Sequence, residues 1–181
     1  RDRWLTREEA NRLLEAANSE PKAPYLSDFI RLALYTGARR GELLGLEWSR
    51  VDLQANVIRL ESVHTKTATP RVIPLCQQAR QALIGRQRFR ASHCPSASNV
   101  FVNWQGHTLS SIKRSFSTAC KRAGISEFRI HDLRHTFASW LVTEGVPLLE
   151  VSRLLGHSTV KMTERYAHLA PDNLESAVSL L

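Results

Sequence analysis

The chain has 181 residues, enough for one domain that buries its core without disulfide or metal support. It carries 25 Lys and Arg against 17 Asp and Glu, a formal net charge of +8, which favours nucleic acid, or less often an acidic membrane surface, as partner. No apolar run approaches the ~20 residues of a membrane span, and the first residues lack the apolar core of a signal peptide. Three widely spaced cysteines without a CxxC pair indicate reduced thiols in a cytosolic protein.

Hydrophobic periodicity and the positions of glycine and proline predict an α+β fold, a mainly helical domain with one small antiparallel β-sheet. In chain order, the expected elements are a helix opened by a capping box at Thr6 and Glu9, helices over 28–36 and 41–46, strands over 57–60 and 71–75, and helices over 77–90, 110–122, 131–143, 147–155, 160–168 and 173–181. The Thr-rich segment 62–70 predicts a hairpin loop. We find no repeat and no internal linker.

Several catalytic motifs are missing from the chain. It contains no GxxxxGK[ST] loop, which argues against nucleotide hydrolysis, and no GxSxG elbow. Its acidic residues do not gather in the spaced sets that a two-metal nuclease needs. If this basic protein acts on nucleic acid, we expect it to do so without metal or ATP.

The segment HDLRH at 131–135 places two histidines and an arginine near the start of a predicted helix. His131, Arg134 and His135 share a helical face, and a helix N-terminus favours anions, so the cluster suits a phosphate. Two alternatives stay open. The residues are solvated polar groups at a helix start, or His131 and His135 bind a metal, which the nearby Arg134 disfavours.

The segment TGARRGE at 36–42 ends an apolar helix at Gly37 and places Glu42 one turn after Arg39. A guanidinium oriented by a carboxylate can give two parallel hydrogen bonds to a phosphate. Taken alone, a surface ion pair of little energetic value explains these two residues better. His157 in the segment LGH, Tyr166 nine residues later and Lys66 in the hairpin loop are each unremarkable alone.

In this order and spacing, TGARRGE, a hairpin lysine, HDLRH, LGH and a following tyrosine resemble the catalytic domain of the tyrosine recombinase (phage integrase) family, from about residue 4 to 168. The resemblance implies a role for each matching residue. It makes Arg39 and Arg134 the two catalytic arginines, His131 and His157 the active-site histidines, Tyr166 the nucleophile, Lys66 the general acid and Glu42 a supporting acid.

These roles imply a reaction without cofactor. The Tyr166 phenol would attack a DNA phosphodiester, release a 5′-hydroxyl and form a 3′-phosphotyrosine, which a second 5′-hydroxyl reverses. The arginines and His157 would stabilise the extra charge on phosphorus. A tyrosine of pKa ~10 needs a base, for which His131 is the natural candidate.

The same resemblance implies double-stranded DNA as partner, a homotetramer on DNA for a full-length protein and a monomer for this chain. Residues 1–181 would be the catalytic domain alone, lacking the N-terminal core-binding domain, in a cytoplasmic, nucleoid-associated protein of bacterial or phage origin. We expect phosphate contacts from two basic helices. Their candidate residues are Lys113, Arg114, Lys121 and Arg122 on one, and Arg80, Arg86, Arg88 and Arg90 on the other.

Three other functions stay open at this point. A non-catalytic DNA-binding regulator could use 145–166 as a helix-turn-helix and would need neither Arg39 nor Tyr166. A metal-dependent hydrolase could use His131 and His135. A topoisomerase of the same chemistry would relax supercoils without site preference.

Overall fold

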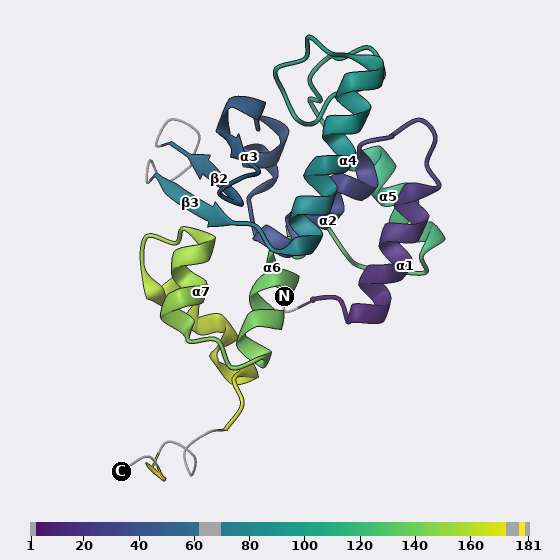
Figure 1. Ribbon diagram of the computed structural model, residues 1–181. Helices are drawn as coiled ribbons and strands as arrows, with labels where there is room; N and C mark the ends of the chain where they lie inside the picture. The colour runs from purple at the N-terminus through teal and green to yellow at the C-terminus, as the bar shows by residue number, and fades with distance from the viewer. Residues whose placement is uncertain (1–2, 62–69, 173–177, 180–181) are drawn as a thin grey trace.

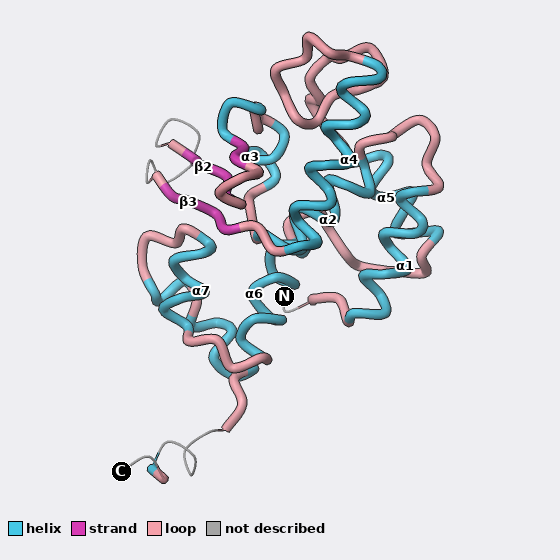
Figure 2. Tube along the Cα trace, in the orientation of Figure 1, coloured by secondary structure: helices cyan, strands magenta, loops and turns pink. Residues whose placement is uncertain are grey.

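The computed structural model describes residues 3–61, 70–172 and 178–179, and it confirms the expected fold class (Figures 1 and 2). The elements in chain order are α1 (Arg7–Asn18), α2 (Leu26–Thr36), α3 (Arg40–Leu44), the 3-10 turn η1 (Trp48–Arg50), β1 (Val51–Asp52), β2 (Val57–Leu60), β3 (Arg71–Pro74), α4 (Gln77–His93), α5 (Lys113–Arg122), α6 (Asp132–Thr143), α7 (Leu148–Leu155), and the 3-10 segments η3 (Val160–Met162) and η4 (Glu164–Leu169). No helix within the described ranges has both the length and the apolar character needed to cross a bilayer.

Helix α2 is the centre of the larger hydrophobic core. Its side chains Phe29, Ile30, Leu32 and Leu34 are completely buried because α1, α4 and α6 all pack against it. The antiparallel sheet, in the order β1-β2-β3, lies next to α3 at the edge of this helical body (Figure 1). The C-terminal end of α2 lies near α3, which follows it directly in the chain, and near α6, whose Arg134 donates a hydrogen bond to Gly37.

A second, smaller core joins α6 to the C-terminal elements. Phe137 and Val142 of α6 pack with Leu155 of α7 and with Tyr166 of η4. Gly37 lies where the two cores meet, with a left-handed φ of 62°. A Cβ at this position would lie 2.4 Å from a ring carbon of Phe137, so only glycine fits there.

Two local expectations were incomplete or wrong. Strand β1 was not predicted because it has only two residues; it pairs Val51 with Ile58 across a turn in which Asn56 has a positive φ. The expected helix over 160–168 is instead the pair of 3-10 segments. Thr163, which caps both segments, and Tyr166, three residues later in the second segment, are both buried. The expected helix over 173–181 lies almost entirely outside the described residues.

Arg86 is an exception to the expectation that the arginines of α4 mostly meet phosphates. Its side chain is 1% exposed, and its guanidinium donates hydrogen bonds to the carbonyl oxygens of Pro24 and Val100. It also lies over the ring of Phe89, at 4.2 Å from the centroid. Arg86 therefore holds the N-terminal end of α2 to α4 and is not available to a phosphate.

Asp28 is an acidic residue that this packing partly buries. Its carboxylate lies in the first turn of α2, where a Cβ on Gly85 of α4 would approach it to 3.1 Å. Burial raises the pKa of Asp28 to about 6, and the positive charges of Arg86 and Arg31 only partly oppose that effect. The folded state therefore disfavours the ionised carboxylate.

We expect Asp28→Asn to stabilise the protein at high pH. A carboxyl group whose pKa is higher folded than unfolded loses stability as pH rises from about 4 to about 6 and stays destabilised above that range. The variant should gain about 1–3 kcal/mol in free energy of unfolding at pH 8 and almost nothing at pH 4. Urea denaturation at both pH values measures this. The exposed Glu144→Gln is the control, and an equal effect of Asp28→Asn at both pH values contradicts the prediction.

Candidate active site

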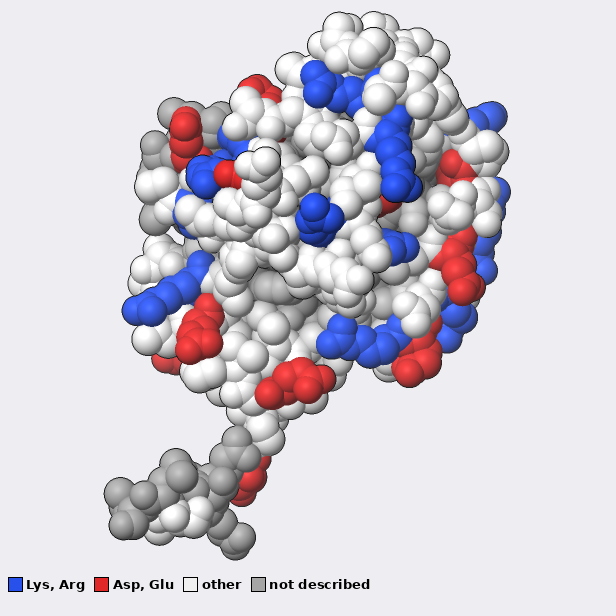
Figure 3. Space-filling model, in the orientation of Figure 1, with Lys and Arg blue, Asp and Glu red and all other residues white. Residues whose placement is uncertain are grey.

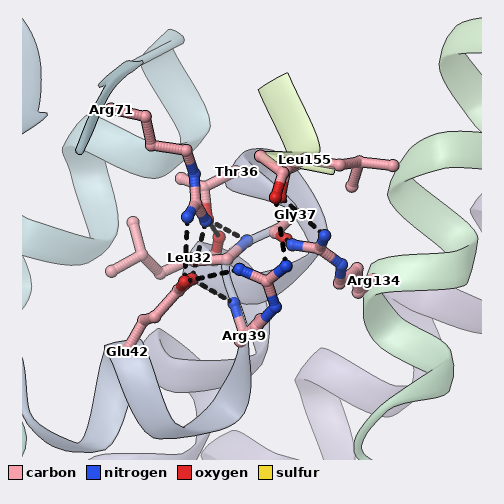
Figure 4. A network of polar contacts seen from close by, with 10 residues as sticks. Leu32, Thr36, Gly37, Arg39, Glu42, Arg71, Arg134 and Leu155 are labelled. Atoms are coloured by element: carbon pink, nitrogen blue, oxygen red, sulfur yellow. Dashed lines mark hydrogen bonds and ion pairs between the residues drawn. The ribbon is translucent and has the colours of Figure 1, made fainter. Parts of the chain in front are cut away.

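Two arginines distant in sequence lie side by side where α2, α3, α6 and α7 meet (Figure 4). Arg134, in the first turn of α6, is 5% exposed and donates to the carbonyl oxygens of Gly37 and Leu155, at 2.7 and 2.6 Å. Both carbonyls belong to C-terminal ends of helices, which attract a positive charge. Arg39, the residue before α3, donates to the carbonyl oxygen of Gly156 at 3.1 Å. These contacts fix the orientation of each guanidinium.

Glu42 is the buried carboxylate on which this arrangement converges. Its oxygens accept hydrogen bonds from the backbone N–H and Nη1 of Arg39 and from Nη1 and Nη2 of Arg71, at 2.6 to 3.0 Å. Burial alone would raise the pKa of Glu42, but the hydrogen bonds from Arg71 and Arg39 outweigh it and lower the pKa. The carboxylate therefore stays ionised and orients both arginines.

Arg71 is a site residue that the sequence analysis missed. It begins β3, its side chain is 8% exposed, and it forms a bidentate ion pair with Glu42. The alternation of the strand carried a signal, because Arg71 shares a face with the buried Ile73 while Val72 points to solvent. A charged residue on the buried face of a strand requires an acidic partner.

Gly156, the residue that ends α7, lies in close contact with the side chain of Arg71. It has a φ of 62°, and a Cβ there would lie 2.8 Å from Cδ and 2.9 Å from Nη1 of Arg71. Its carbonyl oxygen also receives the hydrogen bond from Arg39. The glycine of the LGH segment is thus required both by its backbone conformation and by the close approach of Arg71.

His157 follows this glycine and lies beside the arginines. Burial, then the charges of Arg134, Arg39 and Arg71, lower its pKa to about 4, so the imidazole is neutral at pH 7. Its Nδ1 lies 2.8 Å from the hydroxyl oxygen of Thr163, which is completely buried. A hydroxyl proton donated to Nδ1 leaves the imidazole proton on Nε2, where it can be offered to an anion.

The two histidines of the HDLRH segment, His131 and His135, lie next to each other at the start of α6. The rings of His131 and His135 meet edge to face, 4.8 Å apart. Burial and the charge of Arg134 lower the pKa of His131. Nδ1 of His135 forms a hydrogen bond with the hydroxyl group of Tyr166, whose side chain is 6% exposed. The structure therefore places His135, and not the expected His131, at the phenolic oxygen.

Two hollows in the surface lie beside Arg39 and His131. One of about 690 Å³ is lined by Arg39, Glu42 and His131, among others. An adjoining one of about 920 Å³ is lined by apolar residues of the α5 region together with Lys113 and Lys121. Arg40, Ile130 and His131 line both hollows, so the two lie next to each other.

The other candidate residues are placed as follows. Arg114 is exposed on α5 and lines neither hollow, whereas Arg122 forms an ion pair with Glu20 at 3.1 Å. Lys66 lies outside the described residues. Within those residues, no group of three or more His, Cys, Asp or Glu side chains could hold a metal. On the face seen in Figure 3, Lys and Arg are interspersed with Asp and Glu rather than merged into one patch.

Residues 3–173 match the model of the phage integrase family. The chain belongs to this family. It is 35% identical to the integrase of Salmonella phage P22, over 96% of this chain and 46% of that protein. It is 33% identical to the tyrosine recombinase XerC of Bacillus pumilus, over 94% of this chain and 58% of that protein. The chain thus spans about half the length of these relatives.

Solved structures agree with this family assignment. The XerA recombinase superimposes with a TM-score of 0.77 at 31% identity, over 98% of this chain and 64% of that one. The catalytic domain of bacteriophage HP1 integrase superimposes with a TM-score of 0.75 at 31% identity, over 97% and 93%. The fold is therefore that of a tyrosine recombinase catalytic domain, as the resemblance implied.

Gly156→Ala should destabilise the protein more than an alanine at another left-handed glycine. Gly124 is the matched control, because its φ is 66° and a Cβ there meets nothing within 4 Å. We expect Gly124→Ala to cost ~1–2 kcal/mol for the backbone conformation alone. Gly156→Ala should cost at least ~1 kcal/mol more, because Arg71 must move. Denaturant unfolding measures both, and equal costs contradict the contact.

Thr163→Val should change the tautomer of His157, because valine keeps the branched shape of threonine and removes the hydroxyl donor. We expect the ¹⁵N chemical shifts of the His157 ring to report a proton on Nε2 in the wild type and in Thr163→Ser. The valine variant should show a mixture of both tautomers. Thr118→Val on α5 is the control. Unchanged His157 shifts in Thr163→Val would refute this role of the hydroxyl.

Proposed function

We propose that this chain is the catalytic domain of a site-specific DNA recombinase or integrase that cleaves and rejoins DNA through a 3′-phosphotyrosine at Tyr166. The observation that carries the proposal is that Arg39, Arg134 and His157 lie close together at the end of α7, where the charges of both arginines lower the pKa of His157 and the phenol of Tyr166 is near enough to affect the pKa of Arg134. Membership of the phage integrase family supports it.

The arginines retain the donors that a phosphate needs. A guanidinium has five N–H donors, and the hydrogen bonds that Arg39 and Arg134 make to described residues involve two nitrogens of each guanidinium. The remaining donors can bind the non-bridging oxygens of a phosphodiester. The extra negative charge on phosphorus in the transition state would then meet two fixed cations and Nε2–H of His157.

The covalent step needs no external energy source. The Tyr166 oxygen would form a bond to phosphorus while the bond from phosphorus to the 5′-oxygen breaks, and the leaving oxygen would take a proton from a general acid. The resemblance to the family assigns that role to Lys66. The phosphotyrosine keeps the energy of the phosphodiester, so a second 5′-hydroxyl can reverse the step.

The surface beside the cluster fits a DNA backbone. Lys113 and Lys121 line the hollow that Arg40 and Arg129 also line and that adjoins the one beside Arg39. Such cations bind phosphates with little sequence information and with strong salt dependence. Arg122 is a weaker candidate than expected because its guanidinium is engaged by Glu20. XerH recombinase, 22% identical, was solved bound to a difH substrate.

We further propose that the partner is double-stranded DNA, that the full-length protein acts as a homotetramer on it while this chain is a monomer, and that it works in the cytoplasm at the nucleoid.

Two of the rival functions are less favoured. A helix-turn-helix regulator would need a recognition helix near 160–166, where the chain forms 3-10 segments with Tyr166 buried. The compared relatives are named integrases and recombinases rather than topoisomerases.

Tyr166→Phe should abolish covalent capture of DNA. The protein is incubated with a pool of nicked duplexes of random sequence around the nick, so that the short downstream fragment, released with its 5′-hydroxyl, diffuses away. We expect an SDS-resistant protein–DNA band with the wild type and with Tyr35→Phe, whose ring packs against Trp140. The band should persist in EDTA, which a metal-dependent hydrolase would not survive. Absence of the band from the wild type, or its persistence in Tyr166→Phe, contradicts the proposed function.

A further inference from the structure

His135 directly follows Arg134 on α6, and its imidazole is not part of the lining of the hollow beside Arg39. His131 lines that hollow with Glu42. His135 instead lines a small pocket together with Tyr166 and Arg165. The two neighbouring histidines therefore face different groups, His131 the space beside the arginines and His135 the phenol.

The position of the phenol is set by packing. Tyr166 belongs to the small core formed with Phe137 and Leu155, and its side chain is nearly completely buried. Its hydroxyl nevertheless meets Nδ1 of His135. The phenol is also close enough to Arg134 to influence the pKa of that guanidinium. The hydroxyl of Tyr166 thus contacts a histidine nitrogen and lies within the electrostatic reach of one of the two cations.

The surroundings of His135 keep its imidazole neutral. Burial lowers its pKa to about 4, and the neighbouring charge of His131 acts in the same direction. The other charged groups that face it are Arg165, Asp132 and Arg134, of which only Asp132 favours the protonated form. At pH 7 the ring therefore has one unprotonated nitrogen, and a nitrogen that contacts a phenol can accept its proton.

We infer that His135 is a further catalytic residue, which receives the phenolic proton of Tyr166 on Nδ1 as the tyrosine oxygen attacks phosphorus. This inference rests on the proposed function. The O–H bond of Tyr166 breaks, the O–P bond forms, the bond to the 5′-oxygen breaks, and that oxygen takes its proton from the separate general acid. In the rejoining step the same nitrogen returns the proton to the leaving phenolate. His131 then acts beside the phosphate rather than on the nucleophile.

The test measures the single-turnover rate of covalent capture on the nicked-duplex pool between pH 6 and pH 10. His135→Ala should slow capture about 10²–10⁴-fold at pH 7, the usual contribution of a positioned base. The loss should shrink toward pH 10 because the phenol then ionises without help. Added imidazole should restore part of the rate, and so should 3,5-difluorotyrosine at position 166, whose phenol has a lower pKa.

Two further variants separate catalysis from folding. His135→Asn keeps a polar acceptor of similar reach but no basicity, so it should fold normally and lose the same rate as His135→Ala. His93→Ala, at the exposed end of α4, should keep the wild-type rate. A His135→Asn variant with the wild-type rate overturns the inference. So does a loss that is the same at every pH and that neither imidazole nor difluorotyrosine relieves. If the wild type forms no covalent product at all, the proposed function itself fails.

Discussion

The ionised carboxylate of Glu42 is the group on which the geometry of this domain depends. A buried carboxylate is costly unless hydrogen bonds replace the water it loses. Here the backbone N–H of Arg39 and the guanidiniums of Arg39 and Arg71 satisfy both of its oxygens. Removing one partner would leave a buried charge unpaired, so the network can exist only when α3 and β3 are both in place.

The same network links elements that the chain forms far apart. Arg71 brings β3 against Gly156, and Arg39 donates to the carbonyl of that glycine. Arg134, 97 residues from Gly37, joins the end of α2 to the end of α7. The hydrophobic packing of α2 against α6 places these groups near each other, and the hydrogen bonds then fix their orientation. The anion site that we propose here would be preorganised, because its cations are already oriented before a ligand arrives.

The C-terminal part of the domain combines packing and chemistry in the same residues. Thr163, at the junction of the two 3-10 segments, and Tyr166, in the second, are joined by an i to i+3 backbone hydrogen bond, and both are buried. One of them contacts His157 and the other contacts His135, so two imidazoles are oriented by one short stretch of chain. Burial keeps these histidines neutral at physiological pH, which suits them to donate or accept a proton rather than to add positive charge.

The sequence alone determined the helical character of most segments, the hairpin strands and the positions of Gly37 and Gly156, because periodicity, capping and left-handed turns depend on neighbouring residues. The order of its motifs also pointed to the family, which comparison with known proteins confirmed. It did not reveal Arg71 as the second partner of Glu42, the burial of Arg86, or which histidine meets Tyr166. Only the tertiary structure decided these, because each depends on side chains from distant segments competing for the same buried space.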